Sequence, residues 1–152
     1  MTQTATLCEL CHHPFFAGMK EELLADLNDC TRMVGLQAGQ YLGRTGQDAD
    51  AFYLISTGRV AIEMDTPQRG PVFIQALGPG DVVGWSWLMP PHCWRFHARA
   101  METIRALEID GTRLRHLCEE NHELGYELLR RLIEVVTGRL AATRTQLLER
   151  ME

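Results

Sequence analysis

The sequence predicts a mainly β fold with flanking helices (α+β). We expect a double-stranded β-helix of the jelly-roll or β-roll type, with an N-terminal helical cap and a long C-terminal helix. Short β-type runs separated by glycines fill the middle of the chain, a helical pattern precedes them and a longer one follows. The length of 152 residues fits a single domain. This domain divides into a cap at 1–32, a β-roll at 33–110 and C-terminal helices at 111–152.

The cap contains a short amphipathic segment, Met19 to Cys30. Three of its apolar residues repeat at helical spacing, namely Leu23, Leu24 and Leu27. His13-Pro14 interrupts the chain before it, because the residue before a proline disfavours the helical conformation. We therefore expect a short helix that buries its leucine face.

The middle of the chain, Met33 to Ile109, consists of eight runs with β-type composition. In order they read VGL, QYLG, AFYLI, RVAIEM, VFIQAL, DVVG, WRFHARAME and TIRALEI. Strands at such close spacing are typical of a jelly roll or β-roll. Thr57-Gly58 separates two of these runs and predicts a tight hairpin, because glycine tolerates positive φ.

The C-terminal part is helical, with Asp110 as the expected N-cap and a last helix from His122 to Arg150. One apolar stripe of this helix is assigned to packing on the barrel: Leu124, Leu128, Leu132 and Val135. A second stripe follows the 4-3 spacing of a coiled-coil seam: Leu129, Ile133, Val136, Leu140, Thr143 and Leu147. The alternative is that both stripes wrap the same barrel. The seam favours a homodimer through the C-terminal helix.

Composition excludes several classes of protein. A net charge of −5, with Lys20 as the only lysine, disfavours a general polyanion binder. The N-terminus lacks the pattern of a signal peptide, and no apolar run is long enough to span a membrane. We expect a cytoplasmic protein in which the five cysteines are free thiols.

The segment Leu77 to Ala100 is the most informative for function. It begins with a Gly-Pro-Gly-Asp turn, continues into a short apolar strand, and ends in a loop rich in aromatic residues. Two stretches, Phe52 to Val60 (FYLISTGRV) and Gly78 to Gly84 (GPGDVVG), match in order and spacing the motifs of one family. The chain thus resembles the cyclic nucleotide-binding domain, the sensor half of the catabolite-activator/Fnr regulators, over Pro14 to Leu148.

The resemblance implies a phosphate-binding loop in which backbone N–H groups and one arginine hold the anion, and a glutamate accepts from the ribose hydroxyl. In this sequence Trp85 stands at the place of the glutamate. A direct alignment puts Trp94 at the place of the arginine, and a shift of one residue puts Arg95 there instead. With the carboxylate replaced, we expect cAMP and cGMP not to bind in the usual way.

The loop nevertheless offers a candidate ligand-binding set. Its aromatic rings would stack on a base or close an apolar pocket, with a serine and an arginine as polar contacts. The alternative is that the rings fill the loop as core. The candidate residues are Gly84, Trp85, Ser86, Trp87, Trp94, Arg95 and Phe96.

The function predicted from these observations is that of a regulatory ligand-sensing module without its own DNA-binding or catalytic domain. The expected partners are a second copy of the chain and a separate protein, with neither nucleic acid nor membrane. A nucleotide or another small molecule of unknown identity is a candidate ligand, and no cofactor is expected. The alternatives are a cyclic nucleotide binder with an altered cassette, a metal-binding cupin-like protein and a thiol-redox protein.

Other motifs carry weaker predictions. Cys8-Glu9-Leu10-Cys11-His12 fits the c-type haem attachment pattern, but the chain shows no export signal, so we expect no covalent haem. Cys8, Cys11, His12 and His13 lack the second ligand pair of a zinc finger, so no metal site is assigned. A cupin would hold a metal with paired histidines, whereas His92 and His97 are five residues apart. No hydrolase, zincin or Walker motif is present, and no catalytic residue is assigned.

Overall fold

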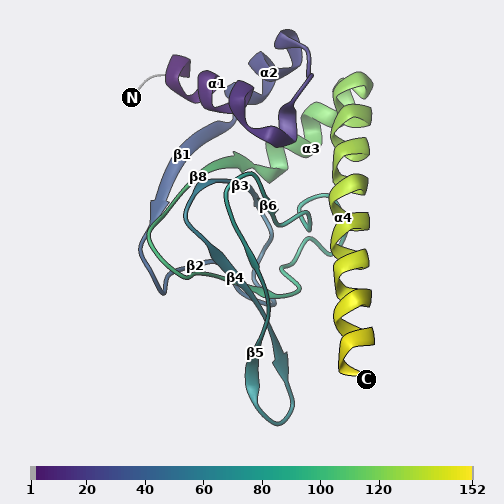
Figure 1. Cartoon of the computed structure of the whole chain (residues 1–152). Coiled ribbons are helices and arrows are strands. Elements are labelled where there is room, and N and C mark those ends of the chain that lie inside the picture. The colour runs from purple at the N-terminus through teal and green to yellow at the C-terminus, as the bar shows by residue number, and fades with distance from the viewer. Residues whose placement is uncertain (1–2, 152) are drawn as a thin grey trace. The chain divides into compact units, whose positions relative to one another are not determined.

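The computed structural model of the chain describes residues 3–151. They form two compact units, the first ending at His116 and the second beginning at Leu117. The first unit contains all the strands and the N-terminal helices (Figure 1). Within the described residues, no helix is both long enough and apolar enough to span a membrane.

The predicted cap is present as two helices joined by a short 3₁₀ helix. These are α1 (Gln3–His12), η1 (Pro14–Phe16) and α2 (Glu21–Asn28). The leucine face of α2 is buried as expected: Leu23, Leu24 and Leu27 are at most 3% exposed. The first strand begins at Thr31, two residues before the predicted start of the β-roll.

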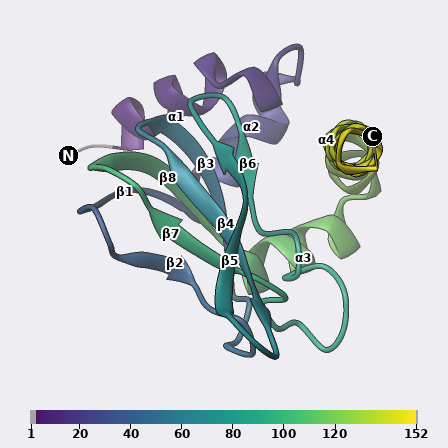
Figure 2. The same ribbon diagram turned by 60° about the horizontal axis from the view of Figure 1, so that its bottom comes forward.

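Two four-stranded antiparallel sheets form the β-roll, which confirms the predicted fold class (Figure 2). One sheet has the order β1-β8-β3-β6 and the other the order β2-β7-β4-β5. All eight predicted runs contribute a strand: β1 (Thr31–Leu36), β2 (Tyr41–Gly43), β3 (Ala51–Thr57), β4 (Val60–Thr66), β5 (Gly70–Leu77), β6 (Val82–Val83), β7 (His97–Ala100) and β8 (Ile104–Asp110).

The prediction of a hairpin at Thr57-Gly58 is wrong. β3 pairs with β6 and β8, whereas β4 pairs with β5 and β7, so the chain crosses from one sheet to the other at Gly58. The glycine itself is required, because its φ is +91° and a Cβ there would lie 2.6 Å from the carbonyl oxygen of Thr103. The hairpin joins β4 to β5 instead and projects from its sheet (Figure 1).

Side chains from both sheets fill the interior of the roll. This cluster consists of Leu42, Ala49, Ala51, Tyr53, Ile55, Val60, Ile62, Leu77, Val83, Trp94, Ala98, Ala100 and Ile104, with Val34, Leu36 and Phe96 partly buried against it. Most members are aliphatic and small. Trp94 is by far the largest side chain among them and comes from the loop between β6 and β7.

Two helices follow the roll, α3 (Gly111–Glu120) and α4 (His122–Arg150). Asp110 caps α3 as predicted, since its Oδ1 accepts from the backbone N–H of Arg113 at 3.1 Å. The first stripe of α4 is largely buried, with Leu124, Leu128 and Leu132 at most 4% exposed. The second stripe is open: the exposed fractions are 48% for Leu129, 63% for Ile133, 46% for Leu140 and 59% for Leu147.

Candidate functional site

The turn that opens the candidate site is fixed to β3 through its main chain. The N–H of Gly78 donates to Oδ2 of Asp81 at 2.8 Å, which closes the turn. The N–H of Gly80 donates to the carbonyl of Ile55 at 3.0 Å, and the N–H of Ile55 donates to the carbonyl of Asp81 at 2.9 Å. These bonds lead the chain into β6 and then to Gly84, whose φ is +83°.

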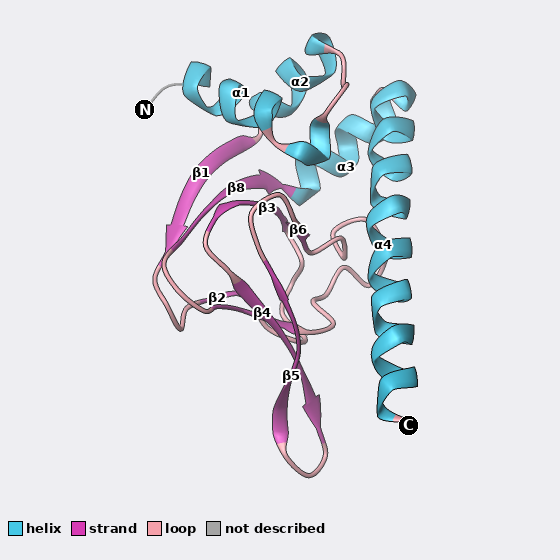
Figure 3. Cartoon of the chain, in the orientation of Figure 1, coloured by secondary structure: helices cyan, strands magenta, loops and turns pink. Residues whose placement is uncertain are grey.

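The loop after Gly84 contains no helix (Figure 3). One turn is present near its start, where the N–H of Leu88 donates to the carbonyl of Trp85 at 3.1 Å. Near its end, three backbone hydrogen bonds of 2.7–2.9 Å attach the loop to the segment before β3: Ala49 to His92, Trp94 to Gln47, and Gly46 to Trp94. The main chain at Trp94 is therefore held on both sides.

Trp94 lies inside the β-roll and is 4% exposed. Its ring contacts Phe96 edge-to-face with centroids 5.6 Å apart, and lies 6.4 Å from the ring of Tyr53. Two glycines make room for the indole: a Cβ on Gly43 would overlap the ring, and one on Gly84 would lie 2.8 Å from it. The space between Gly43 and Gly84 inside the roll is therefore filled by a side chain of the protein, the indole of Trp94.

Trp87 lies elsewhere, although the same loop carries it. It is fully buried against Phe52, with ring centroids 5.6 Å apart, and is not part of the interior cluster of the roll. A Cβ on Gly111 would come within 2.6 Å of it. Its carbonyl accepts from Nη1 of Arg115 at 2.6 Å, which ties this part of the loop to α3.

The other candidate residues differ in exposure. Ser86 and Gly84 are buried, Trp85 and Phe96 are half-buried, and Arg95 is exposed. Arg95 follows Trp94, and only Trp94 belongs to the interior cluster. The structure thus does not bring the seven predicted residues into a single cluster. That they bind a ligand stays a prediction.

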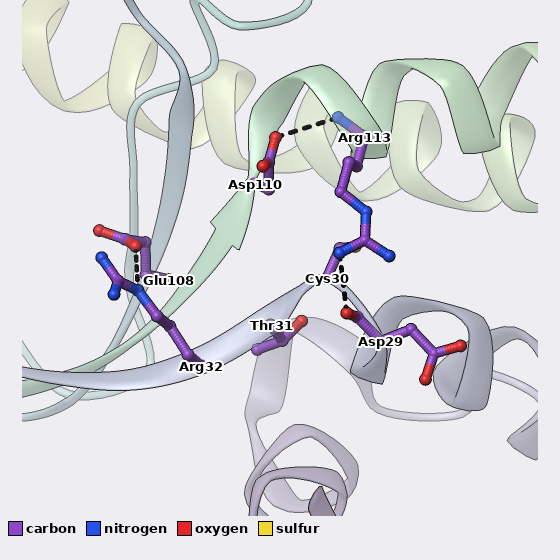
Figure 4. Close-up of a pocket in the computed structure, with 7 residues that line it drawn as sticks. All are labelled: Asp29, Cys30, Thr31, Arg32, Glu108, Asp110 and Arg113. Atoms are coloured by element: carbon purple, nitrogen blue, oxygen red, sulfur yellow. Dashed lines mark hydrogen bonds and ion pairs between the residues drawn. The ribbon is translucent and has the colours of Figure 1, made fainter.

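A polar cavity of about 320 Å³ lies at the junction of α2, β1 and the end of β8 (Figure 4). Asp29, Cys30, Thr31, Arg32, Glu108, Asp110 and Arg113 line it. Both of its arginines have partners within the lining. Nε of Arg32 lies 2.6 Å from Oε1 of Glu108, and Nη1 of Arg113 donates to the carbonyl of Asp29 at 3.0 Å.

The only thiol in this cavity is poorly suited to chemistry. Cys30 is 6% exposed and its Sγ–H donates to the carbonyl of Leu27 at 3.3 Å. Burial is the main cause that raises the pKa of its thiol to about 11. A thiol that stays protonated near neutral pH is a weak nucleophile and a weak metal ligand. This cavity therefore offers no reactive thiol.

The four residues of the weak metal motif do not converge. Cys8 and Cys11 are exposed on α1, and Nδ1 of His12 bonds to the carbonyl oxygen of Cys8 at 2.7 Å. His13 is buried, and its Nε2 lies 3.0 Å from the carbonyl oxygen of Ile55. Across residues 3–151, no group of three or more His, Cys, Asp and Glu side chains is arranged to hold a metal ion.

The two histidines of the cupin alternative, His92 and His97, have different surroundings. His97 is buried on β7; its Nδ1 accepts from the N–H of Thr45 at 3.3 Å and its Nε2 lies 3.0 Å from Oδ2 of Asp65. Nδ1 is thus occupied by a main-chain hydrogen bond, and Nε2 lies within ion-pair distance of a carboxylate. His92 is a loop residue with a φ of 58°. The burial of His97 and His13 was not predicted, because nothing in the local sequence distinguishes a buried histidine from an exposed one.

Comparison with known proteins agrees with this architecture. Residues 33–121 match the family described as the cyclic nucleotide-binding domain. This match covers more than half of the chain, from β1 through all of α3. The chain therefore belongs to the cyclic nucleotide-binding domain family, as the sequence motifs predicted. That family is one of regulatory sensor domains.

Three relatives illustrate the likeness. The CRP-like cAMP-activated global transcriptional regulator of Mycobacterium tuberculosis is 26% identical over 132 residues, which are 87% of this chain and 57% of the relative. A putative cyclic nucleotide-binding protein from Geobacter metallireducens is 25% identical, with a TM-score of 0.78 over 92% of this chain and 98% of its own. A cyclic nucleotide-binding domain from Methylobacillus flagellatus is 20% identical, with a TM-score of 0.84 over 96% and 84%. The chain spans little more than half the length of the mycobacterial regulator.

Proposed function

We propose that this protein is a regulatory module of the cyclic nucleotide-binding domain family in which cAMP and cGMP do not occupy the β-roll in the usual way. The position of Trp94 carries this proposal. Its indole fills the interior of the roll against Gly43 and Gly84, where no space for a Cβ remains. A ligand would have to displace a side chain whose main chain is hydrogen-bonded on both sides.

The chemistry of the loop supports the same proposal. Under the direct alignment, Trp94 takes the place of the family's phosphate-binding arginine, and its ring belongs to the interior cluster. Arg95 is exposed and is not part of that cluster, which disfavours the shifted alignment. Trp85 takes the place of the glutamate that accepts from the ribose, so both groups that recognise the nucleotide are replaced by indoles.

We further propose that the protein acts as a parallel homodimer through α4. The supporting observation is the open stripe of Leu129, Ile133, Leu140 and Leu147, each close to half exposed or more. Large apolar residues at 4-3 spacing along an exposed helix face are typical of a two-stranded coiled coil. A second copy of α4 would cover this stripe with residues of the same kind.

Isothermal titration calorimetry with cAMP and cGMP tests the main proposal. We expect no measurable binding to the wild type at nucleotide concentrations up to about 1 mM, the range of a binding free energy near 4 kcal/mol. A micromolar dissociation constant would contradict the proposal.

The matched variant is the double substitution Trp85→Glu with Trp94→Arg, which restores the carboxylate and the guanidinium on the same main chain. We expect it to bind the nucleotides more tightly than the wild type does. Circular dichroism and a thermal melt must first show that it folds. A folded double variant with no gain in affinity would mean that the two indoles do not account for the loss of binding.

A further inference from the structure

His13 uses both nitrogens of its ring, one toward the β-roll and the other within the cap. Its Nε2 lies 3.0 Å from the carbonyl oxygen of Ile55 on β3, and its Nδ1 accepts from the N–H of Phe15 at 3.2 Å. The side chain is 5% exposed and forms the N-cap of η1. Only the neutral ring with its proton on Nε2 makes both bonds, because Nδ1 must accept while Nε2 donates.

The carbonyl of Ile55 is shared with the turn that opens the candidate site. It accepts from Nε2 of His13 and also from the N–H of Gly80, each at 3.0 Å. On the other side of His13, Phe15 packs edge-to-face on Phe52 with ring centroids 5.6 Å apart. One imidazole therefore stands between η1, β3 and the turn at Gly80.

The ring of His13 borders a cavity of about 260 Å³. The cavity is lined by Glu9, His12, His13, Pro14, Ile55, Ser56, Pro79 and Gly80. The charged groups that face His13 are Glu9 from α1 and Asp81 from the turn, and β3 contributes only the uncharged Ile55 and Ser56. Asp81 already accepts from the N–H of Gly78 at 2.8 Å.

From this geometry we propose that His13 is a proton-controlled switch, in which the neutral ring caps η1 while it bonds to β3, and protonation breaks the η1 cap. The second proton would sit on Nδ1 and face the N–H of Phe15, so the N-cap bond of η1 is lost. Nε2 still donates to Ile55 in the charged ring, so the switch loosens η1 at the point where the cap meets β3.

The direction of the pH response follows from the environment of the ring. Burial lowers the pKa of His13 below its ordinary value of 6.5 and outweighs the opposing effects of the bond to Ile55 and the charges of Asp81 and Glu9. Because the folded state binds the proton less well than the unfolded state, the contribution of His13 to stability is complete above pH 6.5. It falls as the pH drops from 6.5 through the folded-state pKa.

Nuclear magnetic resonance of the full chain tests the switch. Between pH 7.5 and pH 5, we expect the amide resonance of Phe15 to shift together with the titration of the His13 ring. The hydrogen-exchange protection factor of Phe15, corrected for the intrinsic exchange rate at each pH, should fall by up to about tenfold per pH unit within that window. Fixed Phe15 shifts and constant protection factors would overturn the proposal.

Two variants separate His13 from its neighbour. His12→Gln removes an exposed histidine of the same cavity and should keep the transition. His13→Gln keeps a polar side chain that does not titrate in this range, so the protection factor of Phe15 should stay flat over the same range. A transition that persists in His13→Gln would assign it to another group and overturn the switch. If His13→Gln does not fold, shared titration of His13 and Phe15 in the wild type and in His12→Gln supports the proposal, and separate titration overturns it.

Discussion

Phe52 and Tyr53 are neighbours on β3 and pack against two different tryptophans of the same loop. The ring of Phe52 lies 5.6 Å from that of Trp87, and the ring of Tyr53 lies 6.4 Å from that of Trp94. Consecutive side chains of a strand point to opposite faces, and only Tyr53 and Trp94 belong to the interior cluster of the roll. The loop thus places Trp94 inside the roll and Trp87 outside it, where Trp87 is buried against Phe52 on the other face of β3.

Because the ring of Trp94 packs directly against Gly43, we expect Gly43→Ala to destabilise the protein. A Cβ at this position overlaps the indole, so the ring or β2 must move. We expect a loss of about 1–3 kcal/mol in the free energy of unfolding, the usual range for overpacking. Urea denaturation followed by circular dichroism measures it.

Gly78→Ala is the matched control for this substitution. Gly78 has open space around it and ordinary backbone angles, so the added methyl group should change the free energy of unfolding by less than about 0.5 kcal/mol. Equal losses for the two variants would mean that a general effect of alanine, rather than the contact with Trp94, explains the result.

Arg95 and Trp87 differ in their predicted contribution to stability. Trp87→Ala should cost about 3–5 kcal/mol, because it empties a fully buried site next to Phe52. Arg95→Ala should change the free energy of unfolding by less than about 0.5 kcal/mol, because the side chain is exposed. Thermal melts of both variants check the ranking. A large loss for Arg95→Ala would show that the arginine is structural and count against a role in ligand binding.

The proposed coiled coil predicts that charges in the open stripe of α4 disrupt the dimer. Ile133→Glu and Leu140→Glu would each bury two unpaired carboxylates per dimer, at about 3–5 kcal/mol for each charge. Light scattering at micromolar concentration should show a dimer for the wild type and a monomer for both variants. Thr145→Glu changes an exposed residue outside the stripe and should remain dimeric. A monomeric wild type, or dimers of all three variants, would rule out this interface.

The cysteines should differ strongly in reactivity. Burial raises the pKa of the Cys30 and Cys118 thiols from 9.0 to about 11, so at pH 8 each holds roughly a hundredfold less thiolate than an unshifted thiol. Cys8 and Cys11 are exposed on α1. Iodoacetamide labelling followed by peptide mass spectrometry should therefore modify Cys8 and Cys11 first. Early labelling of Cys30 would show that the region around α2 opens readily.

The fold was predictable because its signals are local. Strand composition with glycine punctuation identified all eight strands, and the 3.6-residue period identified α2 and α4. The pairing at Thr57-Gly58 was not predictable in the same way. A glycine with positive φ marks a change of chain direction, but the choice between a hairpin and a crossing to the second sheet depends on distant residues such as Thr103.

The candidate site was only partly predictable for a related reason. The frame from Gly78 to Gly84 follows from its turn residues, whereas the loop from Trp85 to Phe96 has no period that assigns each ring to a side of β3. The sequence therefore suggested one aromatic cluster, and the structure places Trp87 and Trp94 on different faces. The bond between His13 and Ile55 had no signal in the sequence, because the two residues are 42 positions apart.

The backbone bonds that hold residues 92 to 94 beside Gly46 and Ala49 do not depend on which side chain stands at position 94. A substitution at that position would change what projects into the roll without changing the path of the loop. The same main chain is thus compatible with a large, a small or a charged side chain inside the roll at position 94. In evolutionary terms, a roll filled by an indole and an open roll can be separated by a few side-chain replacements rather than by a change of fold.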